Sequence, residues 1–258
     1  MLCRGDTRPM DANAQSFGRY AGAYAKARPS YPDALFDWIA GEAPATWSVL
    51  DVATGSGQAA RKLAERFAIV HATDISHEQV SHAVRRPNIQ YAVAEAEASA
   101  LPDASVDAVT VATALHWFEF PRFWAEVRRV SRPGGLFCGW TYGLFDGPAP
   151  LMAHLIEPVL AIIDPYWAEG NRLALRRYPR DEIGFPFMEV EAPSLSMTMD
   201  WTVAKVLAFI GSWSAMTRAR AEGEAARLDA VTDRALAELG DRAVTISMPL
   251  TIVAGRIA

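Results

Sequence analysis

Residues 48–58 read Ser-Val-Leu-Asp-Val-Ala-Thr-Gly-Ser-Gly-Gln, and this stretch decides the fold. Its apolar first half predicts a buried strand over residues 48–53, and apolar residues at helical spacing predict a helix over residues 58–67. Between the two, Gly55 and Gly57 permit the positive φ angles that a tight turn from strand to helix requires. Strand, glycine turn and helix form the first unit of a parallel α/β sheet.

Short β-rich runs predict four further strands, at residues 69–73, 89–94, 106–115 and 136–141. Helical patterns separate most of these runs, which is typical of βαβ units. Ser76 is placed to cap the second helix, and Pro121 to open the helix before the fifth strand. We therefore expect an α/β fold with a Rossmann-like, mostly parallel, seven-stranded sheet and helices on both faces, completed by one or two strands in residues 243–257.

The rest of the chain is expected to form a cap over this sheet. Residues 1–14 are predicted to be a flexible N-terminus, and residues 15–258 a single domain. Within the domain, residues of about 33–141 and 243–258 would form the core. Residues 142–240, which begin with a stretch rich in glycine, proline and aromatic residues, would form loops and helices over a binding face.

Composition and charge exclude several classes of protein. The 258 residues include 25 Lys+Arg and 30 Asp+Glu, a formal net charge of −5, without the basic stripe of a nucleic-acid-binding domain. No apolar run approaches the roughly 20 residues that span a bilayer, and the N-terminus lacks the apolar core of a signal peptide. Two distant cysteines provide neither a disulfide framework nor a metal cluster. We predict a cytoplasmic protein without a metal site, and its oligomeric state stays open.

Two carboxylates beside the glycine turn indicate the ligand. Asp74 ends the second strand nineteen residues after Gly55, where a carboxylate can accept both hydroxyls of a ribose. Asp51 lies on the first strand, four residues before Gly55. A pyrophosphate at this turn would be repelled by Asp51, whereas a ligand with an ammonium group would be attracted to it. The pair therefore favours S-adenosylmethionine over NAD.

Residues 51–58 resemble the first motif of the class I S-adenosylmethionine-dependent methyltransferases, which more often reads Asp-x-Gly-Cys-Gly-Thr-Gly-Gln. Ala53 and Thr54 are the departures. Further segments resemble the subgroup of trans-aconitate-methyltransferase-like proteins, and the resemblance extends from about Phe17 to the C-terminus. These segments include Arg28–Pro–Ser–Tyr–Pro32, Leu101–Pro–Asp–Ala–Ser–Val–Asp107, Ala114–Leu–His–Trp–Phe118 and Arg132–Pro–Gly–Gly135.

The resemblance implies a set of cofactor-binding residues. The glycine turn would contact the methionine portion, Asp74 the ribose, and Glu95 with Ala96 the adenine. An N-terminal lid would include Phe17, Tyr24, Arg28 and Tyr31. The full cofactor set is Tyr24, Arg28, Asp51, Ala53, Gly55, Gly57, Gln58, Asp74, Ile75, Glu95, Ala96 and Thr113.

His116 is the candidate for the chemistry. Methyl transfer from a sulfonium is an in-line displacement, so the protein must mainly align the reacting atoms and exclude water. A neutral imidazole after the fourth strand could take a proton from a hydroxyl acceptor, or it could orient an acceptor that is already a carboxylate. The candidate substrate residues are Phe17, Tyr31, Trp117, Trp140, Tyr142 and Trp213.

The sequence thus predicts a methyltransferase that acts on an oxygen, carboxylate or hydroxyl, of a small molecule. Three alternatives stay open: methylation of carbon or nitrogen in a small natural product, an NAD(P)-dependent oxidoreductase, and a protein that binds S-adenosylmethionine without turnover. Intact binding motifs do not by themselves prove chemistry.

Overall fold

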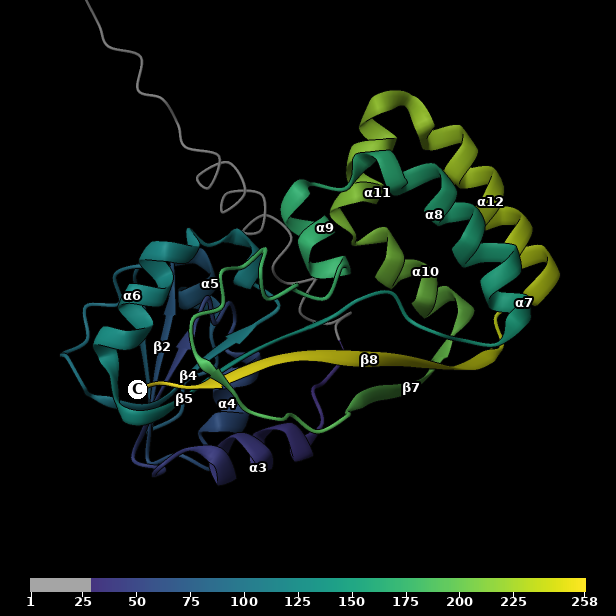
Figure 1. The fold of residues 1–258 in the computed structure, drawn as a ribbon. Coiled ribbons are helices and arrows are strands. Elements are labelled where there is room, and N and C mark those ends of the chain that lie inside the picture. Colours follow the sequence, from purple (N-terminus) through teal and green to yellow (C-terminus); the bar gives the residue numbers. More distant parts are fainter. Residues whose placement is uncertain (1–28) are drawn as a thin grey trace, which may run out of the picture.

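The computed structural model describes residues 29–258, which form an α/β fold with an eight-stranded sheet (Figure 1). The predictions for residues 1–14 and for Phe17, Tyr24 and Arg28 lie outside the described residues. The strands are β1 (Ser48–Val52), β2 (Ile69–Asp74), β3 (Ile89–Val93), β4 (Val106–Ala112), β5 (Ser131–Tyr142), β6 (Met188–Glu189), β7 (Ser196–Thr202) and β8 (Ala243–Arg256).

The sheet has the order β3-β2-β1-β4-β5-β8-β6, and β7 pairs with β8. Strands β1 to β5 pair in parallel, whereas β8 pairs antiparallel with β5, β6 and β7. The predicted mostly parallel sheet is confirmed, but the predicted count of seven strands is wrong. The C-terminal run forms one long strand, β8, that pairs with three others, and two of these, β6 and β7, come from segments without a clear strand pattern.

Helices connect and cover these strands. The α-helices are α3 (Asp33–Glu42), α4 (Gln58–Leu63), α5 (His77–His82), α6 (Phe120–Val130), α7 (Ala149–Leu151), α8 (Glu157–Ile163), α9 (Glu169–Leu175), α10 (Val203–Gly211), α11 (Ser214–Ala219) and α12 (Ala225–Leu239). Short turns of other helix types are η1 (Leu115–Trp117), η2 (Met152–Ile156), η3 (Asp164–Tyr166) and η4 (Arg220–Glu224).

Two apolar clusters cover the two faces of the parallel sheet. On one face, Leu35, Phe36 and Ile39 of α3 pack with residues of α4 and of the strands. On the other face, Phe123 and Val127 of α6 pack against residues of the strands. Every residue of β4 but the last is buried, as a strand covered on both faces must be. The expectation of helices on both faces is confirmed.

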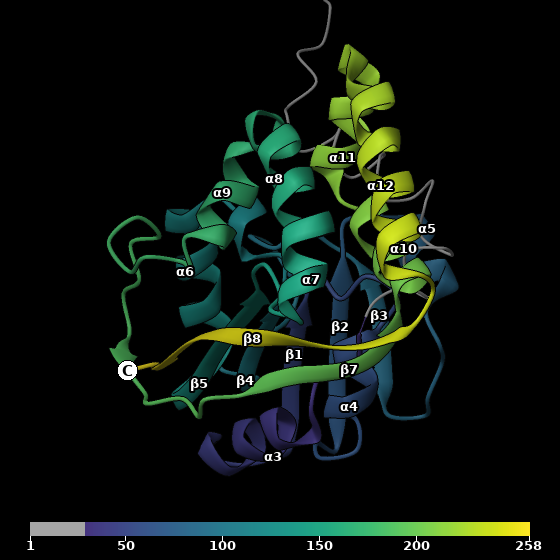
Figure 2. The ribbon, with the colours of Figure 1, turned by 90° about the vertical axis from the view of Figure 1, so that its right-hand side faces the viewer.

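The helices after β5 lie over one end of the sheet. Figure 2 shows α7 to α12 above the strands and α3 below them. The helices above the sheet contribute to the larger apolar cluster through residues such as Leu155, Val159, Ile210 and Leu228. We call α7 to α12 the upper helices.

Three of the boundaries predicted above differ from the structure by three residues or more, because the backbone turns earlier or later than composition suggests. Strand β4 stops at Ala112 instead of continuing to residue 115, because Thr113 has a φ of 57° and ends the extended conformation. Helix α4 ends at Leu63, before the predicted end at residue 67. Strand β5 starts at Ser131, ahead of the predicted residue 136, and its pairing with β4 is irregular there.

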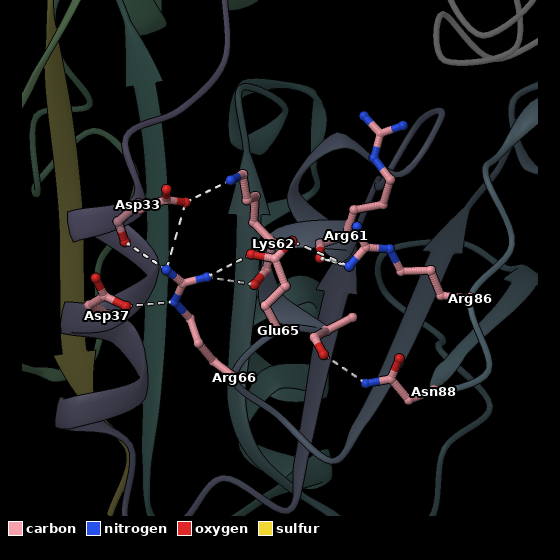
Figure 3. Close-up of polar contacts among 9 residues, drawn as sticks. Asp33, Asp37, Arg61, Lys62, Glu65, Arg66, Arg86 and Asn88 are labelled. Atoms are coloured by element: carbon pink, nitrogen blue, oxygen red, sulfur yellow. Dashed lines mark hydrogen bonds and ion pairs between the residues drawn. The ribbon is translucent and has the colours of Figure 1, made fainter.

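Ion pairs near the surface join α3 to α4 and to the turn that follows α4 (Figure 3). The Lys62 ammonium lies 2.7 Å from the Asp33 carboxylate, and the Arg66 guanidinium 2.8 Å from that of Asp37. Because the acidic side chains are mostly exposed, each pair contributes about 1 kcal/mol or less to stability. The apolar contacts of α3 therefore dominate its attachment to the sheet.

Candidate functional site

Strand β1 lies between β2 and β4, which is the point where the strand order reverses. In an open α/β sheet, ligands bind beyond the carboxyl ends of the strands at such a point. The glycine turn after β1, Asp74 at the end of β2 and Thr113 after β4 all lie at this edge, because the three strands are parallel.

The turn after β1 has three residues in left-handed conformation. Ala53, Gly55 and Gly57 have φ angles of 52°, 56° and 82°. Alanine adopts such an angle at a cost of about 1 kcal/mol, which explains why the resembled motif has glycine at the position of Ala53. A Cβ on Gly57 would lie 2.1 Å from the Tyr91 hydroxyl, so the Tyr91 side chain would have to shift, and at a φ of 82° any other residue would be strained. At Gly55 and Gly57, the turn therefore exposes backbone atoms that no side chain covers to a ligand at this edge of the sheet.

Asp74 holds this turn against the end of β2. Its Oδ2 accepts a 2.8 Å hydrogen bond from the Gly55 N–H, and its Oδ1 accepts one of the same length from the Ser76 N–H. Burial raises the pKa of Asp74, and these two hydrogen bonds partly oppose the rise. Each carboxylate oxygen has a further lone pair, so the group can still accept hydroxyls. Asp74 is thus suited to the ribose role assigned to it.

Asp51 is fully buried beneath the turn. It accepts hydrogen bonds from the hydroxyls of Thr54, at 2.5 Å, and Thr110, at 2.9 Å. Burial raises the pKa of Asp51 to about 6, although both hydroxyls act to lower it. Sequence reasoning identified Asp51 but missed Thr110, because that residue reads as part of a buried strand. Because Asp51 has no exposed surface, a ligand at the turn would sense it through its electric field and not through direct contact.

The remaining cofactor candidates lie along the same edge with different exposure. Ile75 is 40% exposed and can offer an apolar surface to a flat ring. Glu95 is exposed and Ala96 buried, next to an isolated bridge between Glu95 and Ala98. Gln58 uses its side-chain amide to bind the Pro29 carbonyl at 2.7 Å, which ties the segment before α3 to the glycine turn.

Tyr31 and Thr113 join the segment before α3 to the end of β4. Their hydroxyls lie 2.8 Å apart. The Tyr31 ring packs edge-on against Trp140, with ring centroids 5.5 Å apart, and Trp140 also meets Phe36 edge-on. Trp140 is fully buried, so the structure places it in the core beneath Tyr31, not on a surface that a substrate would touch.

His116 lies in η1, immediately after this end of β4, and is partly buried. Its Nδ1 is 2.7 Å from the hydroxyl of Tyr178, a residue 62 positions further along the chain. Its ring centroid is 4.7 Å from that of Trp117. Tyr178 was missed by sequence reasoning, since a single tyrosine before a proline carries no distinguishing signal.

Of the remaining substrate candidates, Tyr142 is partly buried at the end of β5. Trp213 is also partly buried and lies among aromatic side chains of the chain after β5, 5.8 Å from Trp167 and 6.3 Å from Phe145 between ring centroids. Helix α9 approaches η1 closely, since a Cβ on Gly170 would lie 2.8 Å from the His116 carbonyl oxygen. The upper helices thus reach the residues at the end of β4.

Residues 29–258 hold neither a candidate metal cluster nor a helix that could span a membrane. No group of three or more His, Cys, Asp or Glu side chains in this part of the chain is arranged to hold a metal ion. Likewise, none of its helices combines the length and apolar character needed to cross a bilayer.

Sequence comparison identifies relatives of the chain. Residues 50–139 match the family described as "Methyltransferase domain". A Dictyostelium discoideum protein named as a methyltransferase is 32% identical over 208 residues, which is 77% of this chain and 76% of that protein. An uncharacterized methyltransferase of Mycobacterium tuberculosis is 43% identical over 123 residues, 46% of this chain and 49% of that protein.

Solved structures agree with these relatives. A structure from Anaeromyxobacter dehalogenans described as a type II methyltransferase is 40% identical, with a TM-score of 0.82, and covers 89% of this chain and 98% of that one. A phosphoethanolamine N-methyltransferase of Haemonchus contortus in complex with S-adenosylmethionine shares the fold, with 15% identity and a TM-score of 0.53 over 98% of this chain and 61% of that one. The chain belongs to the class I S-adenosylmethionine-dependent methyltransferases.

Proposed function

We propose that this methyltransferase transfers a methyl group to an oxygen, carboxylate or hydroxyl, of a small molecule. The proposal depends on His116. Its imidazole is partly exposed, lies at the same edge of the sheet as the glycine turn, and has its Nδ1 within hydrogen-bond distance of the Tyr178 hydroxyl. Hydrogen bonding from a ring nitrogen suits an oxygen acceptor. The formal net charge of −5 favours a small-molecule acceptor over a nucleic acid.

The residues at the strand ends fit S-adenosylmethionine. The left-handed turn at Ala53, Gly55 and Gly57 would hold the methionine portion by backbone contacts, and Asp74 would accept the ribose hydroxyls. The buried charge of Asp51 would favour the cationic end of the ligand. The remaining proposed contacts are Tyr24, Arg28, Gln58, Ile75, Glu95, Ala96 and Thr113. The bound cofactor supplies an electrophilic methyl group on a positively charged sulfur.

The acceptor would bind between these residues and the upper helices. Trp117 and Tyr142 offer partly buried aromatic rings near the sheet edge, and Trp213 offers one from the helices after β5. Such a wall excludes water and aligns the acceptor with the methyl group, which is the main requirement of an in-line displacement. We therefore propose residues 142–240 as the substrate cap, with Phe17 and Tyr31 on the N-terminal side.

The motifs after the third strand support placing the chain in the trans-aconitate-methyltransferase-like subgroup. They include His116 within Ala114–Leu–His–Trp–Phe118. The names of the sequence relatives specify no acceptor, so both the subgroup and the oxygen acceptor belong to this proposal. The apolar and charge patterns support a cytoplasmic location.

The test is methyl transfer from labelled S-adenosylmethionine to a panel of small acids, phenols and amines, with binding of S-adenosylhomocysteine measured by calorimetry. Asp74→Ala should weaken binding about tenfold or more, because it removes the proposed ribose acceptor. His116→Ala should lower turnover and leave cofactor affinity within about twofold. Transfer to amines alone, or turnover unchanged in His116→Ala, would contradict the proposal.

A further inference from the structure

Tyr178 is held in place by an unusual turn at the end of α9. The Arg177 N–H donates to the Ala174 carbonyl at 2.9 Å, and the Tyr178 N–H to the Leu173 carbonyl at 3.2 Å. This pattern closes many helices, with glycine as the usual left-handed residue. Here Arg177 and Tyr178 both adopt positive φ, 66° and 50°. Two such residues cost about 1 kcal/mol or more each, so other contacts must maintain the turn.

The turn directs the Tyr178 ring inward. The side chain is fully buried, its ring stacks near His116 with centroids 6.0 Å apart, and its hydroxyl meets His116 Nδ1 at 2.7 Å. Burial raises the pKa of Tyr178 well above its ordinary value, so the phenol keeps its proton at neutral pH. A protonated phenol in a buried site must donate its hydrogen bond to a neighbour.

The neighbours of the phenol oxygen decide where that proton points. The Thr141 hydroxyl and the His116 backbone N–H both lower the pKa of Tyr178 by hydrogen bonding, against the larger effect of burial. The backbone N–H can only donate, and the threonine hydroxyl can also donate. A neutral imidazole nitrogen is a stronger base than an alcohol oxygen. The Tyr178 hydroxyl is therefore expected to donate its proton in a hydrogen bond to Nδ1 of His116.

We propose that Tyr178 is a positioning residue that donates to Nδ1 of His116 and so holds the imidazole as the tautomer with its proton on Nε2. In that tautomer His116 offers an N–H donor to the methyl acceptor and takes no proton from it. The inference rests on the proposed function, in which the acceptor meets His116. It implies that the attacking oxygen arrives already ionised.

The tautomer can be read directly by nitrogen NMR of the full chain labelled with ¹⁵N-histidine. The chain has five histidines, and His116→Asn identifies the resonances of His116. We expect a protonated Nε2 and a hydrogen-bonded, unprotonated Nδ1. In Tyr178→Phe the Nδ1 resonance should move toward that of an unbonded ring nitrogen. A proton on Nδ1 in the unaltered protein would overturn the proposal, and this readout needs no acceptor.

Kinetics provide the second readout. Tyr178→Phe should lower kcat about tenfold, the effect of one lost hydrogen bond, with the KM for S-adenosylmethionine within about twofold. Ser105→Ala also removes one side-chain hydrogen bond, that from Ser105 to the Pro102 carbonyl in an exposed turn before β4, and should leave kcat unchanged. Equal kcat in the two variants would overturn the positioning role. If the unaltered protein methylates no acceptor in the panel, the proposed function fails while the tautomer is still decided by NMR.

Discussion

Asp51 and Asp107 are both buried carboxylates of the parallel sheet, but they lie at opposite ends of it. Asp107, at the amino end of β4, accepts hydrogen bonds from the Trp47 and Ser48 N–H groups at 2.9 and 2.8 Å and pairs with Arg132 at 2.6 Å. Asp51, at the carboxyl end of β1, has two hydroxyl partners, and no cation contributes to its pKa among the residues that the structure describes.

The charge of Asp107 has a cationic partner within the protein, whereas that of Asp51 has none among the described residues. The charge of Asp107 is compensated within the protein, so it stabilises the start of β1 and β4. The charge of Asp51 is held in a low-dielectric site by two hydroxyl groups and without a compensating cation among the described residues, and burial destabilises its ionised form. Perturbed carboxylates of this kind are frequent at binding sites. A cationic ligand would provide the missing compensation.

Replacing Asp107 should have the largest effect on stability. Asp107→Ala leaves two backbone N–H groups without their partner, and we expect a loss of about 3 kcal/mol in the free energy of unfolding, measured with urea. Asp103→Ala is the control, because Asp103 is 79% exposed in its pair with Arg129 and should cost less than about 1 kcal/mol. Equal losses of stability in Asp107→Ala and Asp103→Ala would contradict the structural role given to the buried Asp107.

Asp51→Asn should change stability in the opposite direction, depending on pH. The pKa of Asp51 rises from 3.8 to about 6 on folding, so the folded state binds more protons between these values and stability falls as pH rises. The loss is about 3 kcal/mol by pH 7. Asp51→Asn lacks this loss, so its free energy of unfolding should equal that of the parent near pH 3 and exceed it near pH 7.

Unfolding curves from pH 3 to 8 measure the stability of Asp51→Asn and of the parent protein. Calorimetry with S-adenosylmethionine measures their affinity for the cofactor. The variant should bind the cofactor more weakly if the buried charge attracts its cationic end. A variant that is less stable than the parent at pH 7 would show that Asp51 serves the fold as Asp107 does.

Two alanines with positive φ allow a finer comparison of the two ends. Ala53 lies in the glycine turn, and Ala104, with a φ of 47°, in an exposed turn before β4. Replacing either with glycine should stabilise the protein by about 0.5–1 kcal/mol, because glycine adopts this conformation without strain. Only Ala53→Gly should alter the affinity for S-adenosylhomocysteine. Thermal unfolding measures the stability of both variants, and calorimetry measures their affinity for S-adenosylhomocysteine.

The smallest effect is expected at the surface pair of Lys62 and Asp33. Lys62→Ala should reduce stability by about 0.5 kcal/mol or less, and salt should diminish the difference further. Urea unfolding at low and high salt measures it. A loss as large as that of Asp107→Ala would mean that exposed charges also determine the stability of this fold.

Much of the sheet could be predicted, because its signals are local. The glycine turn, the alternation of strand and helix, and the cap at Ser76, whose side chain accepts from the Gln79 N–H, each depend on residues within a few positions of one another. Strands β6 and β7 could not be predicted, because their pairing depends on β8, a distant segment, more than on their own composition.

The site divides in the same way. Sequence alone determined the left-handed turn and the two carboxylates beside it, because their spacing along the chain carries the geometry. Tertiary structure alone decided that Tyr31 meets Thr113, that Thr110 binds Asp51, and that Tyr178 meets His116. These contacts join residues 82, 59 and 62 positions apart, and no periodicity or turn chemistry encodes them. They follow from the packing of whole elements, so they appear only once the chain has folded.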